Sequence, residues 1–182
     1  MPKYQKKPFH RGPAKDASVL RQQLKKMRQV SIPRPERHDA LLAMCEPYMQ
    51  QIVDGIKNYE FRKYRLITSI KRISFYRVAP HSSVEYICEI EPARTREKGD
   101  EPLEENGLGN WEYNTGHKDW EGYDYAYKIK SVYQLDEPIT LQRLQANYDF
   151  KSAPRGWMYT PKSLVDAVPW KEGKKLRDYD VR

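Results

Sequence analysis

The sequence has few of the residues that build cross-links or metal centres. Its 182 residues include two cysteines and four scattered histidines. Cys45 and Cys88 lack the paired spacing of a zinc site, and both lie in apolar segments. We therefore expect two buried thiols in a reducing compartment, with no disulfide, no metal and no other cofactor.

Long apolar runs and glycine-rich phosphate loops are also missing. No uninterrupted apolar stretch approaches the ~20 residues of a membrane span, and the first residues lack the apolar core of a signal peptide. No glycine pattern typical of nucleotide-binding loops stands out. These absences favour an intracellular protein, cytoplasmic or nuclear, with no membrane partner.

The excess positive charge is concentrated near the N-terminus. The net charge is +8, and residues 1–30 hold nine Lys and Arg against one acid, Asp16, whereas the rest holds 24 of each sign. Attraction to phosphate follows local charge. We expect residues 1–37 to form a basic flexible arm with one helix, whose Lys25 and Lys26 contact nucleic acid. A solvated helix surface would account for the same two lysines.

The remaining length suffices for one hydrophobic core, which we assign to residues 38–165. We expect residues 166–182 to form a charged C-terminal tail that frays at 171–175. A continuous apolar run over 40–45 predicts a strand buried on both faces. After it, Pro47 suits the first turn and Gly55 the end of a short helix.

Alternating apolar and polar side chains predict further strands. These strands cover 57–64, 72–78, 84–91 and 125–135, with a brief apolar segment at 155–159 and a short helix at 138–144. Residues 94–124 lack periodicity, which predicts a lid or a decorated insertion. A strand, a helix and then several strands indicate an α+β fold in which a mixed sheet curls into a barrel.

The stretch after the first predicted helix places a lysine, a carboxylate and a guanidinium within six residues. A period of two puts Tyr59 and Phe61 on one face of the strand, and Glu60 and Arg62 on the other. Lys57 shares the parity of the aromatic pair, so strict alternation would aim it away from Glu60. A surface ladder of ion pairs would use the same residue types, but the position at a helix-to-strand junction favours a binding site.

The residues from Gly55 to Arg62 resemble the signature of the ASCH domains, which belong to the PUA-like superfamily of small β-barrels. The family pattern there is Gly, any residue, Lys, a small or polar residue, an apolar residue, Glu or Thr, any residue, Arg. The likeness continues through later segments, namely 73–76, 87–90, 125–129 and 138–141. It implies a small PUA-like mixed β-barrel with short peripheral helices, carrying the basic N-terminal arm.

The resemblance also implies a module that binds RNA or a modified nucleobase in a cleft beside this motif. In that role Arg62 would take a phosphate or a base edge, Glu60 would accept from an exocyclic amine, and Lys57 would add a cation. Further ligand contacts are expected from Tyr76, Arg77, Arg155, Trp157 and Tyr159. The expected partner is RNA, another single-stranded nucleic acid, or a modified nucleoside.

An enzymatic alternative stays open: an amidohydrolase or ribonuclease-like enzyme acting on a modified nucleoside or RNA. Some small ASCH proteins hydrolyse an acylated cytidine with a Lys, a Thr three residues later and a separate Glu. Lys57 matches the lysine, but Glu60 occupies the threonine position, so the expected hydroxyl is missing. In an enzyme we expect Lys57, Glu60 and Glu89 to be catalytic. A third hypothesis uses the aperiodic segment, with Trp111 and Trp120, as a surface for a protein partner.

Overall fold

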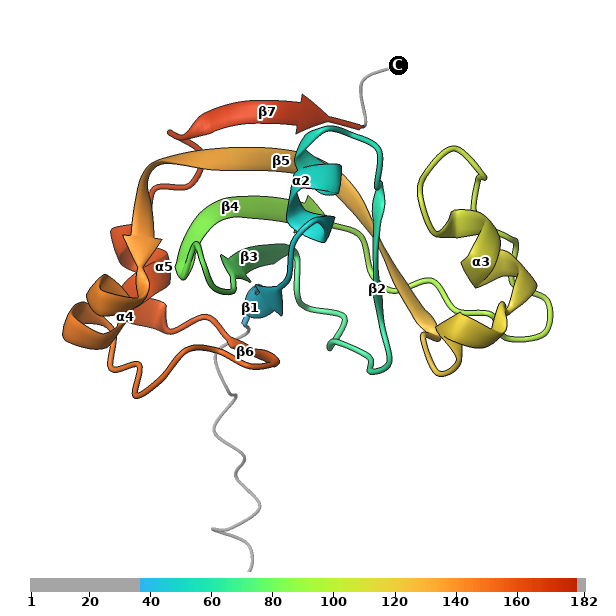
Figure 1. Cartoon of the computed structure of the whole chain (residues 1–182), viewed down its shortest axis with the longest axis horizontal. Coiled ribbons are helices and arrows are strands. Elements are labelled where there is room, and N and C mark those ends of the chain that lie inside the picture. The colour runs from blue at the N-terminus through green and yellow to red at the C-terminus, as the bar shows by residue number, and fades with distance from the viewer. Residues whose placement is uncertain (1–36, 180–182) are drawn as a thin grey trace, which may run out of the picture. The chain divides into compact units, whose positions relative to one another are not determined.

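One strongly curved sheet organises the residues that the computed structural model describes, 37–179 (Figure 1). The strands are β1 (Asp39–Met44), β2 (Tyr59–Arg62), β3 (Arg72–Arg77), β4 (Ser83–Ile90), β5 (Tyr125–Thr140), β6 (Trp157–Tyr159) and β7 (Lys174–Asp178). The helices are α2 (Tyr48–Val53), α3 (Asn110–Thr115), the 3-10 turn η1 (Lys118–Trp120), α4 (Leu141–Asn147) and α5 (Lys162–Ala167). The predicted helix near Asp16 lies outside the described residues.

The strand order is β2-β5-β4-β3-β1-β6, and β7 also pairs with β5. β1 runs parallel to β3, whereas the other pairings are antiparallel. The long β5 bends along the sheet (Figure 1). Its first residues pair with β2, and its later residues pair with β4 and β7. The predicted α+β fold with a mixed sheet is therefore confirmed, as a curled half-barrel with a few short helices.

The apolar run after Arg37 forms β1 because both of its faces are covered. Ala40, Leu41 and Leu42 are fully buried. Leu42 contributes to a core cluster on one side of the sheet, while Leu41 contributes to a second cluster on the other. The predicted strand with two buried faces is thus confirmed, and β1 lies between β3 and β6, next to the end of the strand order.

Two predictions about the C-terminal half are wrong. Residues 138–140 continue β5 instead of starting a helix, because Ile139 pairs with Val84, and α4 begins only at Leu141. The segment expected to fray contains the start of β7, whose Lys174–Asp178 backbone pairs with the middle of β5. Periodicity could not reveal β7, because a strand on a sheet edge can remain largely polar on both faces.

Candidate functional site

The candidate site begins where α2 ends. Gly55 has φ +78°, a left-handed conformation that suits glycine at a helix C-terminus. The backbone N–H groups of Ile56 and Lys57 both donate to the carbonyl of Gln51, at 2.9 and 3.0 Å. The helix end therefore fixes the backbone of Lys57 two residues before β2 begins.

Lys57, Glu60 and Arg62 form a continuous ion-pair cluster, which we call the floor cluster. The Lys57 Nζ donates to Glu60 Oε2 at 2.7 Å, and Arg62 Nη2 forms an ion pair with Glu60 Oε1 at 2.7 Å. Lys57 Nζ also donates to the carbonyl of Tyr59. Because Lys57 precedes the strand, its side chain escapes the alternation and lies on the Glu60 side.

Burial gives the floor cluster its electrostatic character. Lys57 and Glu60 keep only 6% and 4% of their surface exposed. Burial lowers the pKa of Lys57, and the adjacent Glu60 carboxylate counteracts that shift. Burial likewise raises the pKa of the neighbouring Cys88 thiol, which keeps it in the neutral form. The floor cluster is thus poorly hydrated, and a hydrogen bond there is electrostatically stronger than in water.

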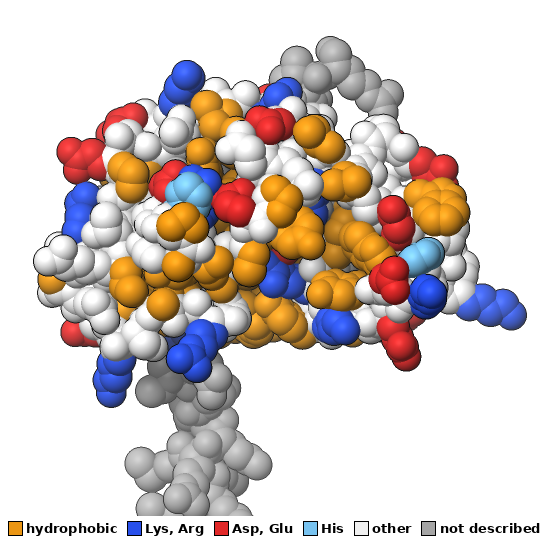
Figure 2. Space-filling model, in the orientation of Figure 1, with side chains coloured by type: hydrophobic (Ala, Val, Ile, Leu, Met, Phe, Trp, Pro, Cys, Tyr) orange, Lys and Arg blue, Asp and Glu red, His pale blue; other side chains and the backbone are white. Residues whose placement is uncertain are grey.

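The floor cluster lines a cleft of about 490 Å³. Its other lining residues are largely aromatic or come from the end of β1: Ala43, Met44, Cys45, Tyr48, Phe61, Asp119, Trp120 and Tyr123. Apolar and basic side chains meet in this part of the molecule, beside the α3 segment (Figure 2). A cleft of this size and composition suits a small flat ligand.

The segment 94–124, predicted as a lid or an insertion, builds one wall of this cleft. Trp120 meets the ring of Phe61 edge-on, with 4.8 Å between centroids. Asn110 is fully buried and donates to Asn58 Oδ1 at 3.1 Å, which ties α3 to the start of β2. The two tryptophans of this segment therefore differ, since Trp120 lines the cleft whereas Trp111 is 52% exposed.

Arg62 links the floor to the end of β1. Its Nη2 also donates to the carbonyl of Ala43 at 3.2 Å, while its Nε is buried without a hydrogen-bond partner. The buried Tyr64 hydroxyl lies beside this guanidinium, and its interaction with Arg62 counteracts the rise that burial causes in the pKa of Tyr64. The five donors of the guanidinium exceed the acceptors that the described residues place beside it, which are Glu60, the Ala43 carbonyl and the Tyr64 hydroxyl.

Three residues predicted for the site lie elsewhere. Tyr76 is 1% exposed and packs in the core cluster that contains Leu41, so its ring is closed to a base. Arg77 is bound to carboxylates in a separate cluster. Glu89 accepts from Ser131 at 2.7 Å and does not line the cleft. The sequence placed all three residues on predicted strands but could not say which elements cover them.

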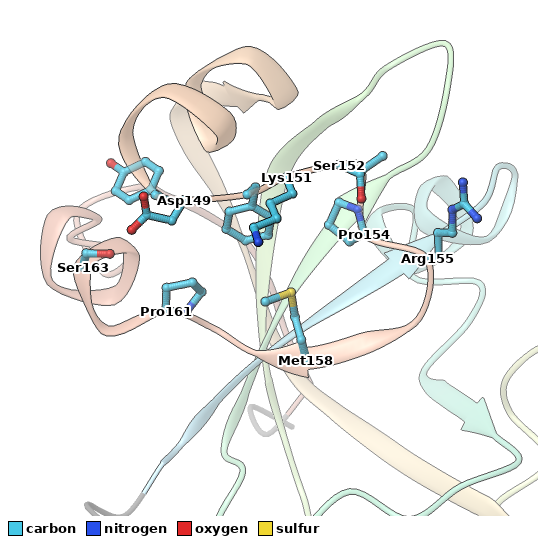
Figure 3. Close-up of a pocket in the computed structure, with 11 residues that line it drawn as sticks. Asp149, Lys151, Ser152, Pro154, Arg155, Met158, Pro161 and Ser163 are labelled. Atoms are coloured by element: carbon cyan, nitrogen blue, oxygen red, sulfur yellow. The ribbon is translucent and has the colours of Figure 1, made fainter.

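The C-terminal candidates lie outside the cleft as well. Arg155 lines a different open groove of about 540 Å³, which Lys151 and Met158 also border (Figure 3). Trp157 stacks with Tyr64 at 6.3 Å, and its edge contacts Tyr159 at 5.4 Å. Trp157 therefore packs against Tyr64, which follows Arg62 by two residues. Lys25 and Lys26 lie outside the described residues.

Sequence reasoning missed several residues of the cleft wall. Cys45 was expected to be buried but is exposed, because β1 ends one residue earlier and Cys45 lies in the following turn. Tyr48 was placed on the helix without a ligand role, yet it lines the cleft and is 51% exposed. Asp119 and Tyr123 come from the aperiodic segment, where no spacing rule indicates which residues meet β2.

Comparison with solved structures identifies the fold. The ASCH protein of Zymomonas mobilis matches with a TM-score of 0.50 and 21% identity, over 72% of this chain and 96% of its own. A serine-to-alanine variant of that protein matches at 0.52 and 22%, over 74% and 99%, and a tyrosine-to-phenylalanine variant at 0.52 and 20%, over 72% and 96%. The chain has an ASCH-type fold. No family model matches the sequence, and no curated protein does.

The ASCH-type fold is found without any sign of a membrane segment or a metal centre in residues 37–179. No helix in that range is long and apolar enough to cross a membrane. Nor does the same range gather three or more His, Cys, Asp or Glu side chains in a way that could hold a metal ion.

Proposed function

We propose that this protein is an RNA- or modified-nucleobase-binding module that receives one unpaired base in the cleft above the floor cluster. The observation that carries the proposal is the combination of a buried Lys57–Glu60–Arg62 cluster with an aromatic wall in one cleft. A flipped or single-stranded base needs hydrogen-bonding groups opposite its edge and aromatic rings beside it. The bottom of this cleft supplies the first, and its wall supplies the second. The ASCH-type fold of the Zymomonas mobilis protein supports the same proposal.

The basic arm has a separate role in this proposal. Residues 1–30 hold the excess positive charge, whereas the rest of the chain holds equal numbers of the two signs. The arm, including Lys25 and Lys26, supplies phosphate affinity that is independent of sequence. The cleft supplies the preference for a particular base.

The two tryptophans of 94–124 provide a matched test. Trp120 lines the cleft, and Trp111 is exposed outside it. We expect Trp120→Ala to weaken binding of a labelled single-stranded RNA by about 1–3 kcal/mol, the worth of one stacked base. Trp111→Ala should leave the affinity unchanged, as fluorescence anisotropy at low salt can measure. Equal affinities for wild type and Trp120→Ala would refute the base-binding cleft.

A second measurement on Trp111→Ala, the capture of a specific protein, tests the hypothesis of a protein partner. If Trp111→Ala leaves RNA binding intact but abolishes capture of a specific protein, the exposed ring belongs to a different surface. The RNA-binding proposal stands in that case only if Trp120→Ala still weakens RNA binding. The two roles therefore separate within one pair of variants.

The lowered pKa of Lys57 favours a second candidate, a hydrolase of the ASCH amidohydrolase type. A lysine with a lowered pKa can act as a base or nucleophile near neutral pH. In this cleft Glu60 would be its proton acceptor, since no threonine occupies that position. Turnover of acylated cytidine by wild type and its loss in Lys57→Ala is the expected result. Equal or absent turnover in both would remove this candidate.

A further inference from the structure

The hydrogen-bonding capacity of the floor cluster is uneven, and this bears on which bases the proposed cleft prefers. Each oxygen of Glu60 is already paired with a cation at 2.7 Å, since Oε2 accepts a hydrogen bond from Lys57 and Oε1 forms an ion pair with Arg62. Bonds between ionised partners at this distance are the strong ones among protein hydrogen bonds. A ligand amine would have to compete with both cations for the same carboxylate.

The donors of the cluster are in surplus. Lys57 has three N–H donors, and its bonds within the described residues reach Tyr59 and Glu60. Arg62 has five donors, and the acceptors that the described residues place beside its guanidinium are Glu60, the Ala43 carbonyl and the Tyr64 hydroxyl. The remaining donors of the two cations outnumber the lone pairs that Glu60 keeps, so the floor has more to donate than to accept.

The direction in which a nucleotide enters decides which base edge meets this floor. The sugar and phosphates of a strand must stay at the open side of a cleft of about 490 Å³. A base then enters with the edge opposite its glycosidic bond first. That edge carries the exocyclic group at position 4 of a pyrimidine or position 6 of a purine, so this group reaches Lys57 and Arg62.

We propose that the floor cluster selects keto bases over amino bases, with Arg62 as the specificity-determining residue. A carbonyl at position 4 or 6 offers two lone pairs to the unused donors, beside one ring N–H. An amino base offers a single ring-nitrogen lone pair there and turns two amino donors toward a floor that already has a surplus of donors. This inference rests on the proposed function and reverses the role expected for Glu60 from the sequence. Glu60 holds the two cations in place and does not read an amine.

Two pairs of nucleosides isolate this choice, because the members of each pair share their shape and differ at the inward edge. Inosine and adenosine differ at position 6, and uridine and cytidine differ at position 4. We expect the full chain to bind inosine over adenosine and uridine over cytidine by about tenfold, in the range that one correctly read base edge provides. Isothermal titration at constant salt measures all four affinities.

The variant Arg62→Gln should bring both ratios close to one, since it replaces the guanidinium by a group that donates and accepts. Arg65→Gln is the matched control, because Arg65 is exposed three residues further along and does not line the cleft. It should keep the wild-type ratios. Equal affinities within the wild-type pairs, a preference for adenosine or cytidine, or unchanged ratios in Arg62→Gln would each overturn the inference. Binding without base preference leaves the proposed function standing, whereas no binding of nucleosides or RNA overturns both.

Discussion

The floor cluster and the cluster around Arg77 both combine basic side chains with carboxylates, but in opposite proportions. In the floor cluster two cations share one carboxylate. Arg77, at the end of β3, is instead shared by two carboxylates, Glu46 and Glu85, each at 2.7 Å, and Arg77 Nη2 lies 2.8 Å from His81 Nε2. Burial tends to lower the pKa of Arg77, but the bonds to Glu46 and Glu85 outweigh it and raise that pKa.

The difference shows that charge balance and available space separate a structural cluster from a binding site. All three nitrogens of the Arg77 guanidinium have a partner among the described residues, and Arg77 lines none of the cavities described above. Arg62 has donors to spare beside a cleft with aromatic walls. Arg77 was expected from the sequence to bind ligand, but its contacts are those of a residue that joins β3, β4 and the turn before α2.

The largest expected effect is a loss of stability when the Arg77 cluster is broken. Arg77→Ala leaves the carboxylates of Glu46 and Glu85 close together without their cation, so the free energy of unfolding should fall by about 3 kcal/mol. RNA affinity of the folded protein should stay unchanged. Arg143→Ala, which breaks an exposed pair with Glu137, should cost less than about 1 kcal/mol in the same urea titration. Similar losses for both variants would contradict a structural role for Arg77.

A smaller effect concerns the way in which the C-terminal strand supports the floor cluster. Arg177 on β7 donates to the carbonyls of Val53 and Asp54 at the end of α2, at 2.9 and 2.5 Å. Arg177→Ala should lower the free energy of unfolding by about 1 kcal/mol and speed amide hydrogen exchange at Lys57. Lys175→Ala on the same strand is the control, because Lys175 contacts Asp178 and the Tyr133 ring, neither of which belongs to the end of α2. Unchanged exchange at Lys57 would show that β7 does not hold the floor.

A pH titration distinguishes the floor from the Arg77 cluster. Because the pKa of Lys57 is lowered in the folded state, the unfolded chain binds more protons between that lowered pKa and 10.5. The stability of wild type relative to Lys57→Met should therefore rise with pH in this window. Urea unfolding at several pH values up to about 10 tests this, with the exposed Lys63→Met as control. A falling or flat difference would mean that Lys57 is not held in a desolvated place.

The smallest change expected at either cluster comes from removing residues 1–30. This deletion takes away nine Lys and Arg and one Asp but touches neither the floor cluster nor Arg77. The logarithm of RNA affinity should then depend less steeply on the logarithm of salt concentration, since fewer phosphates are neutralised. The base preference should be the same with and without the arm. A preference that disappears with the arm would move recognition away from the cleft.

Local sequence predicted the elements that depend on neighbouring residues. The strand over 40–45, the helix ending near Gly55 and the faces of β2 follow from periodicity and helix-end chemistry, and the structure confirms them. The resemblance of the Gly55–Arg62 stretch anticipated the ASCH-type fold. Each of these features depends on residues close together in the sequence, so it could be predicted without the tertiary packing.

The rest depended on contacts between distant segments. Tyr76 and Trp120 look alike as candidate stacking residues, but the first is enclosed by the core while the second packs edge-on against Phe61 and lines the cleft. The sequence by itself determined the floor motif, because helix termination and strand alternation place its backbone. Only the tertiary structure decided how its hydrogen bonds are shared and what walls surround it. The reason is that β1 brings the Ala43 carbonyl to Arg62, and the segment 94–124 brings Trp120 and Tyr123 to the cleft.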